Sequence, residues 1–407
     1  MPGYSKIATH CKIHSSISER VIDHFLMYYA AEREGFERIM NAQFSKFEHL
    51  NFGQSKEAFL NFCRAEYIVS KIFLKNGLIK KYLNHSAIKQ LPAEDYMFLQ
   101  QQSMQPWKFS FAFILRNPAD CFYEMQDVFT DEKYMLYSPS VKNKLQESDP
   151  LLWFNLVGFN GECWQTFGIV ASFRSFDEDD IFFFATEINP AISDAESLID
   201  QVEQNPVPFF MLSVHAETPR VFHKEHALAH LCATDEIASF SLDSYKKKFN
   251  VAWNKDVFQL KLKNNAEFPH YATAYVDEKK KIIFRTAMTD FGFDELTRAL
   301  NICGLNVSDQ ADLRVSLTMI NAINSILKKD IKINPYEKLF SETDSNQKVD
   351  DDQLNRLNDF LQLAMPYLNE GKRPNLKELA KKAEVDYDYA KQLWAIIKRT
   401  KESGGNI

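Results

Sequence analysis

The first hundred residues repeat their apolar positions at helical spacing. Ser16 and Glu19 have the spacing of a capping box, and apolar residues then recur every three or four positions to about His49. A second run of this kind begins at Ser55 and ends at an Asn-Gly pair, which is typical of a helix end. This pattern predicts a helical N-terminal domain over residues 1–105.

The spacing changes to strict alternation in the segment WKFSFAFIL. Large apolar residues occupy every second position from Trp107 to Leu115, which is the period of a strand. Further strand-like segments separated by turn residues follow as far as residue 174. Five or six short strands with tight turns predict a small, barrel-like β unit. With the helix that follows, we place this unit at residues 106–190.

Two helices are predicted from capping boxes after the β unit. One box consists of Ser175 and Glu178, and the other of Ser193 and Glu196. Acidic residues crowd the first turn of the first helix, where they favour the positive end of the helix dipole. The acidic cluster therefore has a structural explanation and lacks the spacing of a calcium loop.

Strand-like and helical segments alternate beyond the second capped helix. Strands are expected at 208–214, 237–241, 257–262, 270–276 and 281–288, with helices near 293–303 and 309–329. This predicts an α+β domain at 191–340, a polar linker at 341–352 and a helical domain at 353–407. The expected fold class is α+β, with a helical N-terminal domain, a mixed antiparallel β/α middle with a barrel-like unit, and a C-terminal tri-helical domain.

Four of the ten histidines lie between Val214 and Cys232. If residues 219–232 form a helix, His226 and His230 are one turn apart and could bind a divalent metal such as zinc together with His215. If the same residues form a strand, His226 and His230 stand roughly 13 Å apart and cannot share an ion. The sequence leaves both alternatives open.

Residues 376–396, LKELAKKAEVDYDYAKQLWAI, have a regular apolar pattern. This segment resembles the helix-turn-helix motif of bacterial transcription regulators, with Ala380 where the first helix must stay small and Glu384 where a glycine usually makes the turn. The resemblance implies a tri-helical domain that contacts nucleic acid or a protein partner. The residues expected to contact nucleic acid are Lys372, Arg373, Lys391, Gln392, Lys398 and Arg399.

The composition of the chain argues against several classes of binding site and against a membrane-spanning segment. The chain has 407 residues and a net charge of −7, which argues against a polyanion-binding surface along its whole length. Its 12 glycines form no phosphate-binding loop, and its six cysteines form no CxxC pair. No run approaches the ~20 apolar residues that span a bilayer, and the first residues do not resemble a signal peptide.

These observations favour a cytoplasmic binding or regulatory protein without a cofactor, whose C-terminal domain contacts nucleic acid or a protein partner and which has no membrane partner. The alternative is a metal-dependent enzyme of the hydrolase type that uses His215, His226 and His230. The familiar catalytic motifs are absent from the sequence, so we do not favour an enzyme. The sequence predicts no oligomeric state.

Overall fold

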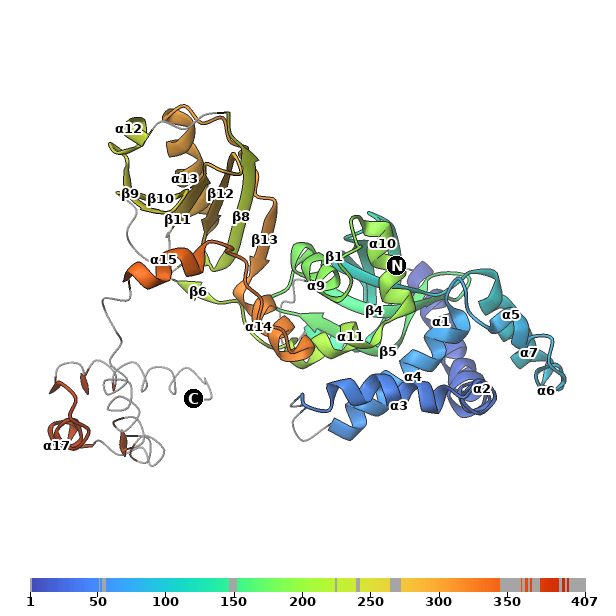
Figure 1. Cartoon of the computed structure of the whole chain (residues 1–407). Helices are drawn as coiled ribbons and strands as arrows, with labels where there is room; N and C mark the ends of the chain where they lie inside the picture. Colours follow the sequence, from blue (N-terminus) through green and yellow to red (C-terminus); the bar gives the residue numbers. More distant parts are fainter. Residues whose placement is uncertain are drawn as a thin grey trace. The chain divides into compact units, whose positions relative to one another are not determined.

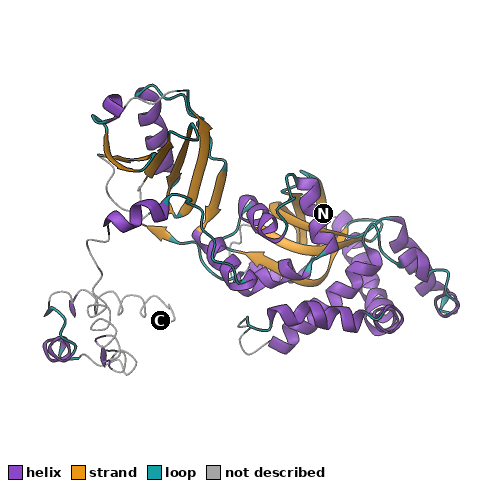
Figure 2. Cartoon of the chain, viewed as in Figure 1, coloured by secondary structure: helices purple, strands orange, loops and turns teal. Residues whose placement is uncertain are grey.

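The computed structural model describes residues 2–50, 52, 56–145, 152–223, 225–238, 242–263 and 272–344, and in the C-terminal part 360, 363, 364, 367, 374–387, 390, 391 and 394. The chain divides into two compact units, Met1–Ile333 and Asn334–Ile407. Figure 1 shows the helices and strands coloured along the sequence, and Figure 2 shows them coloured by secondary structure. Among the residues described, none of the helices combines the length and apolar character that crossing a membrane requires.

The N-terminal region is helical, as predicted. Its first helix begins at Pro2 instead of at the Ser16 capping box, and Gly35, with a φ of 62°, ends the second helix well before His49. A glycine is suited to this turn because it adopts positive φ without steric cost. The elements are α1 (Pro2–Ser18), η1 (Glu19–Leu26), α2 (Met27–Glu34), α3 (Phe36–Phe44), η2 (Ser45–Phe47), α4 (Lys56–Phe73), α5 (Ile79–Tyr82), α6 (Ser86–Lys89) and α7 (Ala93–Met104).

A closed five-stranded barrel follows, which confirms the predicted barrel-like unit. Its strand order is β1-β2-β3-β5-β4; β3 is parallel to β5, and the other neighbouring strands are antiparallel. The strands are β1 (Lys108–Ala119), β2 (Phe122–Asp127), β3 (Lys133–Tyr137), β4 (Leu152–Phe159) and β5 (Trp164–Phe173), and α8 (Pro139–Leu145) connects β3 to β4.

Phe109 and Phe111 of β1 lie on the outer face of the barrel and are buried there by helices, whereas Phe113, the next aromatic residue in the alternation, is 37% exposed. The rings of Phe111 and Phe154 stack with centroids 4.3 Å apart, and Phe210 meets Phe109 at 5.9 Å. Phe210 belongs to α11 (Val207–Met211), which continues into η4 (Leu212–His215). The strand predicted at 208–214 is therefore wrong, because prolines at the helix start favour a helical turn there.

The two capped helices begin one or two residues later than predicted. The side chain of Asp177 accepts a hydrogen bond from the backbone N–H of Asp180 and caps α9 (Glu178–Ile188). Asp194 and Ser197 form the second capping box, at the start of α10 (Ala195–Gln204). Both predicted helices exist, but an aspartate and not the preceding serine takes the capping position.

A six-stranded antiparallel sheet forms the second β structure, in the order β13-β8-β12-β11-β10-β9. The helix α13 (Asp290–Ile302) packs on one face of it. The helix predicted at 309–329 is a short strand, β13, followed by α14 (Leu317–Leu327). The strands are β8 (Ala229–Glu236), β9 (Phe249–Asn254), β10 (Val257–Leu262), β11 (Ala272–Asp277), β12 (Ile282–Ala287) and β13 (Leu313–Ser316), with α12 (Leu242–Tyr245) between β8 and β9.

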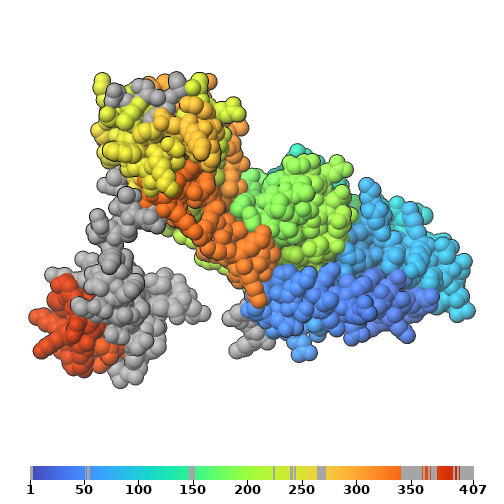
Figure 3. Space-filling view, in the orientation of Figure 1, coloured from blue at the N-terminus to red at the C-terminus, as the bar shows by residue number. Residues whose placement is uncertain are grey.

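One apolar core runs through the regions that the sequence divides at residues 105 and 190. It contains buried residues of the N-terminal helices, the outer face of the barrel, and the helices α9, α11 and α14. Figure 3 shows the N-terminal helices, in blue, packed directly beside the green region of the barrel and its covering helices. A second cluster, separate from this core, joins residues of all five strands and fills the barrel interior.

The C-terminal unit contains α15 (Glu337–Asp344) and α17 (Leu376–Lys382). The first residues of the predicted linker, 341–344, are thus helical, and the rest of the linker, 345–352, lies outside the described residues. At the end of α17, Glu384 has a φ of 52°, and the backbone N–H of Val385 donates to the carbonyl of Ala380 at 2.9 Å. This is the hydrogen bonding of a Schellman turn.

The backbone at Gly158 lies so close to the indole ring of Trp107 that a larger residue at this position should destabilise the fold. Replacing Gly158 by alanine would place its Cβ 2.5 Å from Cε2 of Trp107, inside van der Waals contact. We expect Gly158→Ala to lower the free energy of unfolding by about 1–3 kcal/mol in urea denaturation. Gly3→Ala in α1 is the control, since nothing lies within 4 Å of its added Cβ. Equal losses in the two variants would contradict this explanation.

Candidate functional site

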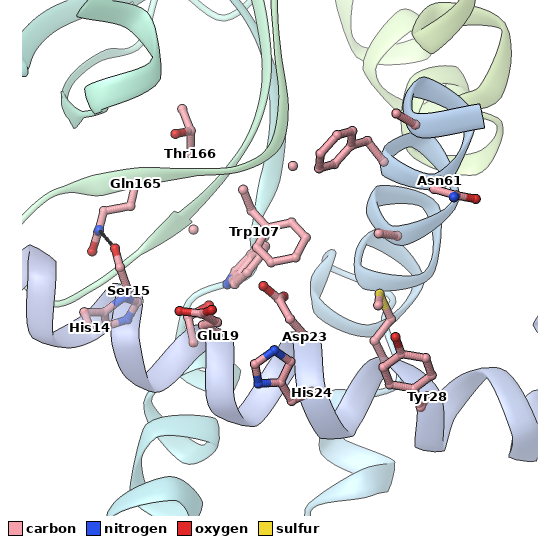
Figure 4. Close-up of a pocket in the computed structure, with 18 residues that line it drawn as sticks. His14, Ser15, Glu19, Asp23, His24, Tyr28, Asn61, Trp107, Gln165 and Thr166 are labelled. Carbon is pink, nitrogen blue, oxygen red and sulfur yellow. Dashed lines mark hydrogen bonds between the residues drawn. The ribbon is translucent and has the colours of Figure 1, made fainter. Parts of the chain in front are cut away.

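A cavity of about 730 Å³ lies between the first helices and the barrel. Its walls come from α1, η1 and α4 on one side and from β4 and β5 on the other. Figure 4 shows Glu19, Asp23 and His24 on the same helical segment, with Trp107 behind them and Gln165 and Thr166 on the neighbouring strand. Volumes of this size accommodate small organic ligands.

The helical segment that borders the cavity is a π-helix, η1. The backbone N–H of Met27 donates to the carbonyl of Ile22, five residues earlier, which is the hydrogen bond that defines this helix type. Each turn therefore contains more residues than an α-helical turn, and the side chains shift around the axis. Segments of π-helix are rare and occur frequently at functional sites.

Asp23 is the most unusual side chain in the lining. It is half-buried, and its Oδ1 atom is buried without a hydrogen-bond partner among the described residues. Burial raises the pKa of this carboxyl, and the nearby carboxylate of Glu19 raises it further. None of the described residues that line the cavity is a lysine or arginine, so the cavity is acidic.

A third carboxyl group, that of Glu66 in α4, does not line the cavity but lies behind its wall at Gly168. It is 1% exposed, and its Oε2 accepts a hydrogen bond of 3.0 Å from the backbone N–H of Ile169. Gly168, which lines the cavity with a φ of 73°, permits this approach, because a Cβ there would lie 2.8 Å from Oε2. Burial raises the pKa of Glu66 to about 8, so the group is largely neutral at pH 7.

Aromatic and amide side chains complete the inner wall. The indole Nε1 of Trp107 donates to Oε1 of Gln102 at 2.8 Å, and Nε2 of Gln102 lies 3.0 Å from Nε2 of His14. Burial lowers the pKa of His14 to about 4, so this ring is neutral at pH 7. Phe62 and Tyr28 are exposed to solvent at the cavity and present aromatic rings to an entering molecule.

The sequence did not point to any of these residues. Asp23 and Glu66 are single acidic residues within amphipathic helices, where most carboxylates are exposed. The only local signal was the glycine at two strand positions, Gly158 and Gly168, which often marks a close approach of another group to the backbone. That signal indicates contact without identifying the partner.

The histidine segment forms strands and a short hairpin, so the helix considered for residues 219–232 is wrong. His223 pairs with His226 across β6 (Phe222–His223) and β7 (His226–Ala227), while His230 lies in β8. His215 ends η4, and burial lowers its pKa. Within the described part of the chain, no group of three or more histidine, cysteine or acidic side chains is arranged to bind a metal ion.

The predicted nucleic-acid contacts are only partly described. Lys391 is exposed, whereas Lys372, Arg373, Gln392, Lys398 and Arg399 lie outside the described residues. Around the Schellman turn, Leu379, Ala380 and Ala390 form a small apolar cluster with the other described apolar residues of this unit.

Comparison with known proteins found no matching family model, no similar curated protein and no similar solved structure.

Because the carboxyl of Glu66 is buried, we expect the free energy of unfolding to depend on pH. Its pKa is about 8 in the folded protein and 4.5 in the unfolded chain, so the unfolded chain loses its proton first and stability falls as pH rises between these values. Glu66→Gln removes this loss, and its free energy of unfolding relative to the wild type should rise between pH 5 and 8 by up to a few kcal/mol, at about 1.4 kcal/mol per pKa unit.

Urea denaturation across this pH range measures the difference. The matched control is Glu57→Gln, an exposed carboxylate on the same helix, for which we expect a nearly constant difference from the wild type. A pH-independent difference for Glu66→Gln would contradict the raised pKa.

Proposed function

We propose that this protein binds a small organic cation in the cavity beside η1. The observation that carries the proposal is the composition of the lining, in which two carboxyl groups and several aromatic rings occur without a described lysine or arginine. Such a lining attracts a positive charge and also accommodates an apolar body. An amidinium or ammonium group attached to an aromatic or aliphatic skeleton has this combination.

Asp23 supplies the main polar contact in this proposal. Its carboxyl is half-buried, and one of its oxygens lacks a hydrogen-bond donor among the described residues. A buried acceptor without a donor costs roughly 1–3 kcal/mol. A cationic N–H group within the cavity would favour the ionised carboxyl and reduce this cost, while Glu19 would add a second negative charge.

The aromatic groups supply the apolar contacts. Trp107 stacks on Phe73 with ring centroids 4.5 Å apart and contacts Phe167 at 5.4 Å, so its ring is held in one orientation. Phe62 and Tyr28 are exposed and can cover the ligand from the solvent side. A rigid inner wall and adaptable outer rings are consistent with binding a flat or compact molecule.

Calorimetric titration of the full chain with benzamidine, a cation, and benzamide, its neutral analogue, tests the proposal. We expect binding of benzamidine at pH 7, at least tenfold weaker binding of benzamide, and a similar loss in Asp23→Asn. Acidification should also weaken binding, because protonation of Asp23 removes its charge. The control is Glu57→Gln, which lies outside the cavity lining. Equal affinities for the two probes, or an unchanged Asp23→Asn variant, would exclude this function.

We also propose that the C-terminal unit contacts nucleic acid. The supporting observation is the turn at Glu384, whose positive φ redirects the chain after α17 beside the buried Ala380 and Ala390. A sharp turn between closely packed helices is what a helix-turn-helix motif needs. Lys372, Arg373, Lys391, Lys398 and Arg399 would contact phosphates, and Gln392 would contact a base or the backbone.

Fluorescence anisotropy with labelled mixed-sequence DNA and RNA tests this second function on the full chain. We expect binding at low salt that weakens as salt increases, and Lys391→Glu should reduce both the affinity and the salt dependence, by roughly one phosphate contact. Lys46→Glu, an exposed lysine of η2, is the control. Absence of binding at low salt, or equal effects of both substitutions, would contradict nucleic-acid contact.

A further inference from the structure

Three of the six cysteines gather at one end of the barrel although they are far apart in the sequence. Cys11 of α1 and Cys163, in the turn before β5, are both buried, and their Sγ atoms lie 3.5 Å apart. Cys121, after β1, packs at the edge of the same cluster and is partly exposed. The Cys11–Cys163 pair therefore brings together two thiols separated by 152 residues.

Hydrogen bonds hold the two thiols in place. The side-chain amide of Asn160 donates to Sγ of Cys11 at 3.2 Å and lies 3.7 Å from Sγ of Cys163. Its Oδ1 accepts from the backbone N–H of Cys163 at 2.8 Å, and Gln165 donates to the carbonyl of Cys11 at 3.1 Å. Residues next to Cys163 in the sequence, Asn160 and Gln165, thus hydrogen-bond to Cys11 and hold the two thiols close together.

The distance between the Sγ atoms of Cys11 and Cys163 is short enough for a disulfide to form. A disulfide has a sulfur–sulfur distance of about 2.05 Å, so the two atoms must approach by roughly 1.5 Å, which small side-chain and backbone adjustments can supply. By contrast, Cys63 is equally buried but lies in α4. It is a matched reference for a thiol in an apolar core.

We propose that Cys11 and Cys163 are a redox-modification site that a small hydroperoxide converts into a disulfide. The thiolate of Cys11 attacks the hydroxyl oxygen of the hydroperoxide, the O–O bond breaks, and Cys11 becomes a sulfenic acid while the other oxygen leaves as hydroxide from hydrogen peroxide or as alkoxide from an organic hydroperoxide. The sulfur of Cys163 then attacks the sulfenic sulfur, and its proton and the hydroxyl leave as water. The two thiols lose two electrons in total, and the hydroperoxide is reduced by the same two.

The surroundings assign the order of these steps. The side-chain amide of Asn160 lies closer to Sγ of Cys11, at 3.2 Å, than to Sγ of Cys163, at 3.7 Å, and the contact with Cys163 together with this amide lowers the pKa of the Cys11 thiol. The same contact raises the pKa of the Cys163 thiol, so Cys11 is the thiol of the pair that loses its proton more readily. Burial raises the pKa of Cys63 well above its ordinary value, so this thiol is unreactive.

The disulfide would tie α1 to the β4–β5 turn. His14 and Ser15 of α1 and Gln165 of β5 line opposite sides of the acidic cavity, so the bond would hold these two walls together. It would also constrain a long loop of the unfolded chain, which stabilises the oxidised protein. The proposal stands on the cysteine geometry and does not depend on the ligand proposed for the cavity.

The test treats the full chain with hydrogen peroxide under native conditions, followed by alkylation of free thiols and peptide mass spectrometry. We expect a peptide pair linked through Cys11 and Cys163, with a loss of 2 Da relative to the two thiols, and a midpoint of thermal unfolding raised by at least about 5 °C. Dithiothreitol should reverse both effects. Failure to form this link while the protein remains folded would overturn the proposal, as would a dominant link that uses Cys121.

Two variants test the order of steps. In Cys163→Ser, the sulfenic acid on Cys11 has no thiol opposite it, so dimedone should label Cys11 after peroxide treatment. In Cys11→Ser, we expect at least tenfold less labelling of Cys163. The control Cys63→Ser should form the Cys11–Cys163 link at the wild-type rate. Equal dimedone labelling of the two single variants would overturn the assignment of Cys11 as the attacking thiol.

Discussion

The aromatic layer between the barrel and its covering helices determines the arrangement of the first unit. Phe109, Phe111 and Phe154 lie on the outer face of the barrel and pack against Phe209 and Phe210 of α11. Because the strands of a barrel have an inner and an outer face, an apolar outer face must be covered by other elements. The helices meet this requirement, and the barrel and the N-terminal helices therefore share one core.

Two residues that line the cavity, Gly158 and Gly168, have no side chain, so other groups approach the strands closely at these positions. Gly158 leaves space for the ring of Trp107, and Gly168 leaves space for the carboxyl of Glu66. The ring of Trp107 and the carboxyl of Glu66 can then approach the backbone of β4 and β5 closely. Burial raises the pKa of Glu66 and lowers the pKa of His14, because the loss of hydration disfavours the charged form of each group.

Two elements connect the proposed ligand site with the proposed redox site. The helix α1 carries Cys11, His14 and Ser15, and the hairpin of β4 and β5 carries Cys163 and Gln165. Gln165 donates hydrogen bonds to the carbonyl of Cys11 and to Oγ of Ser15, so it contacts both regions. A bond between the cysteines would hold the same helix and hairpin that form part of the cavity wall.

Local patterns in the sequence determined the helical N-terminus, the barrel-like unit and three of the later strands, β10, β11 and β12, because periodicity reports which face of an element is apolar. They could not decide residues 208–214, whose aromatic run suits either a strand or a buried helix, or residues 219–232, where both geometries fitted. The candidate site was decided only by tertiary structure. Asp23, Glu66 and the Cys11–Cys163 pair acquire their chemistry from burial and from neighbours far away in the chain, and no local spacing records either property.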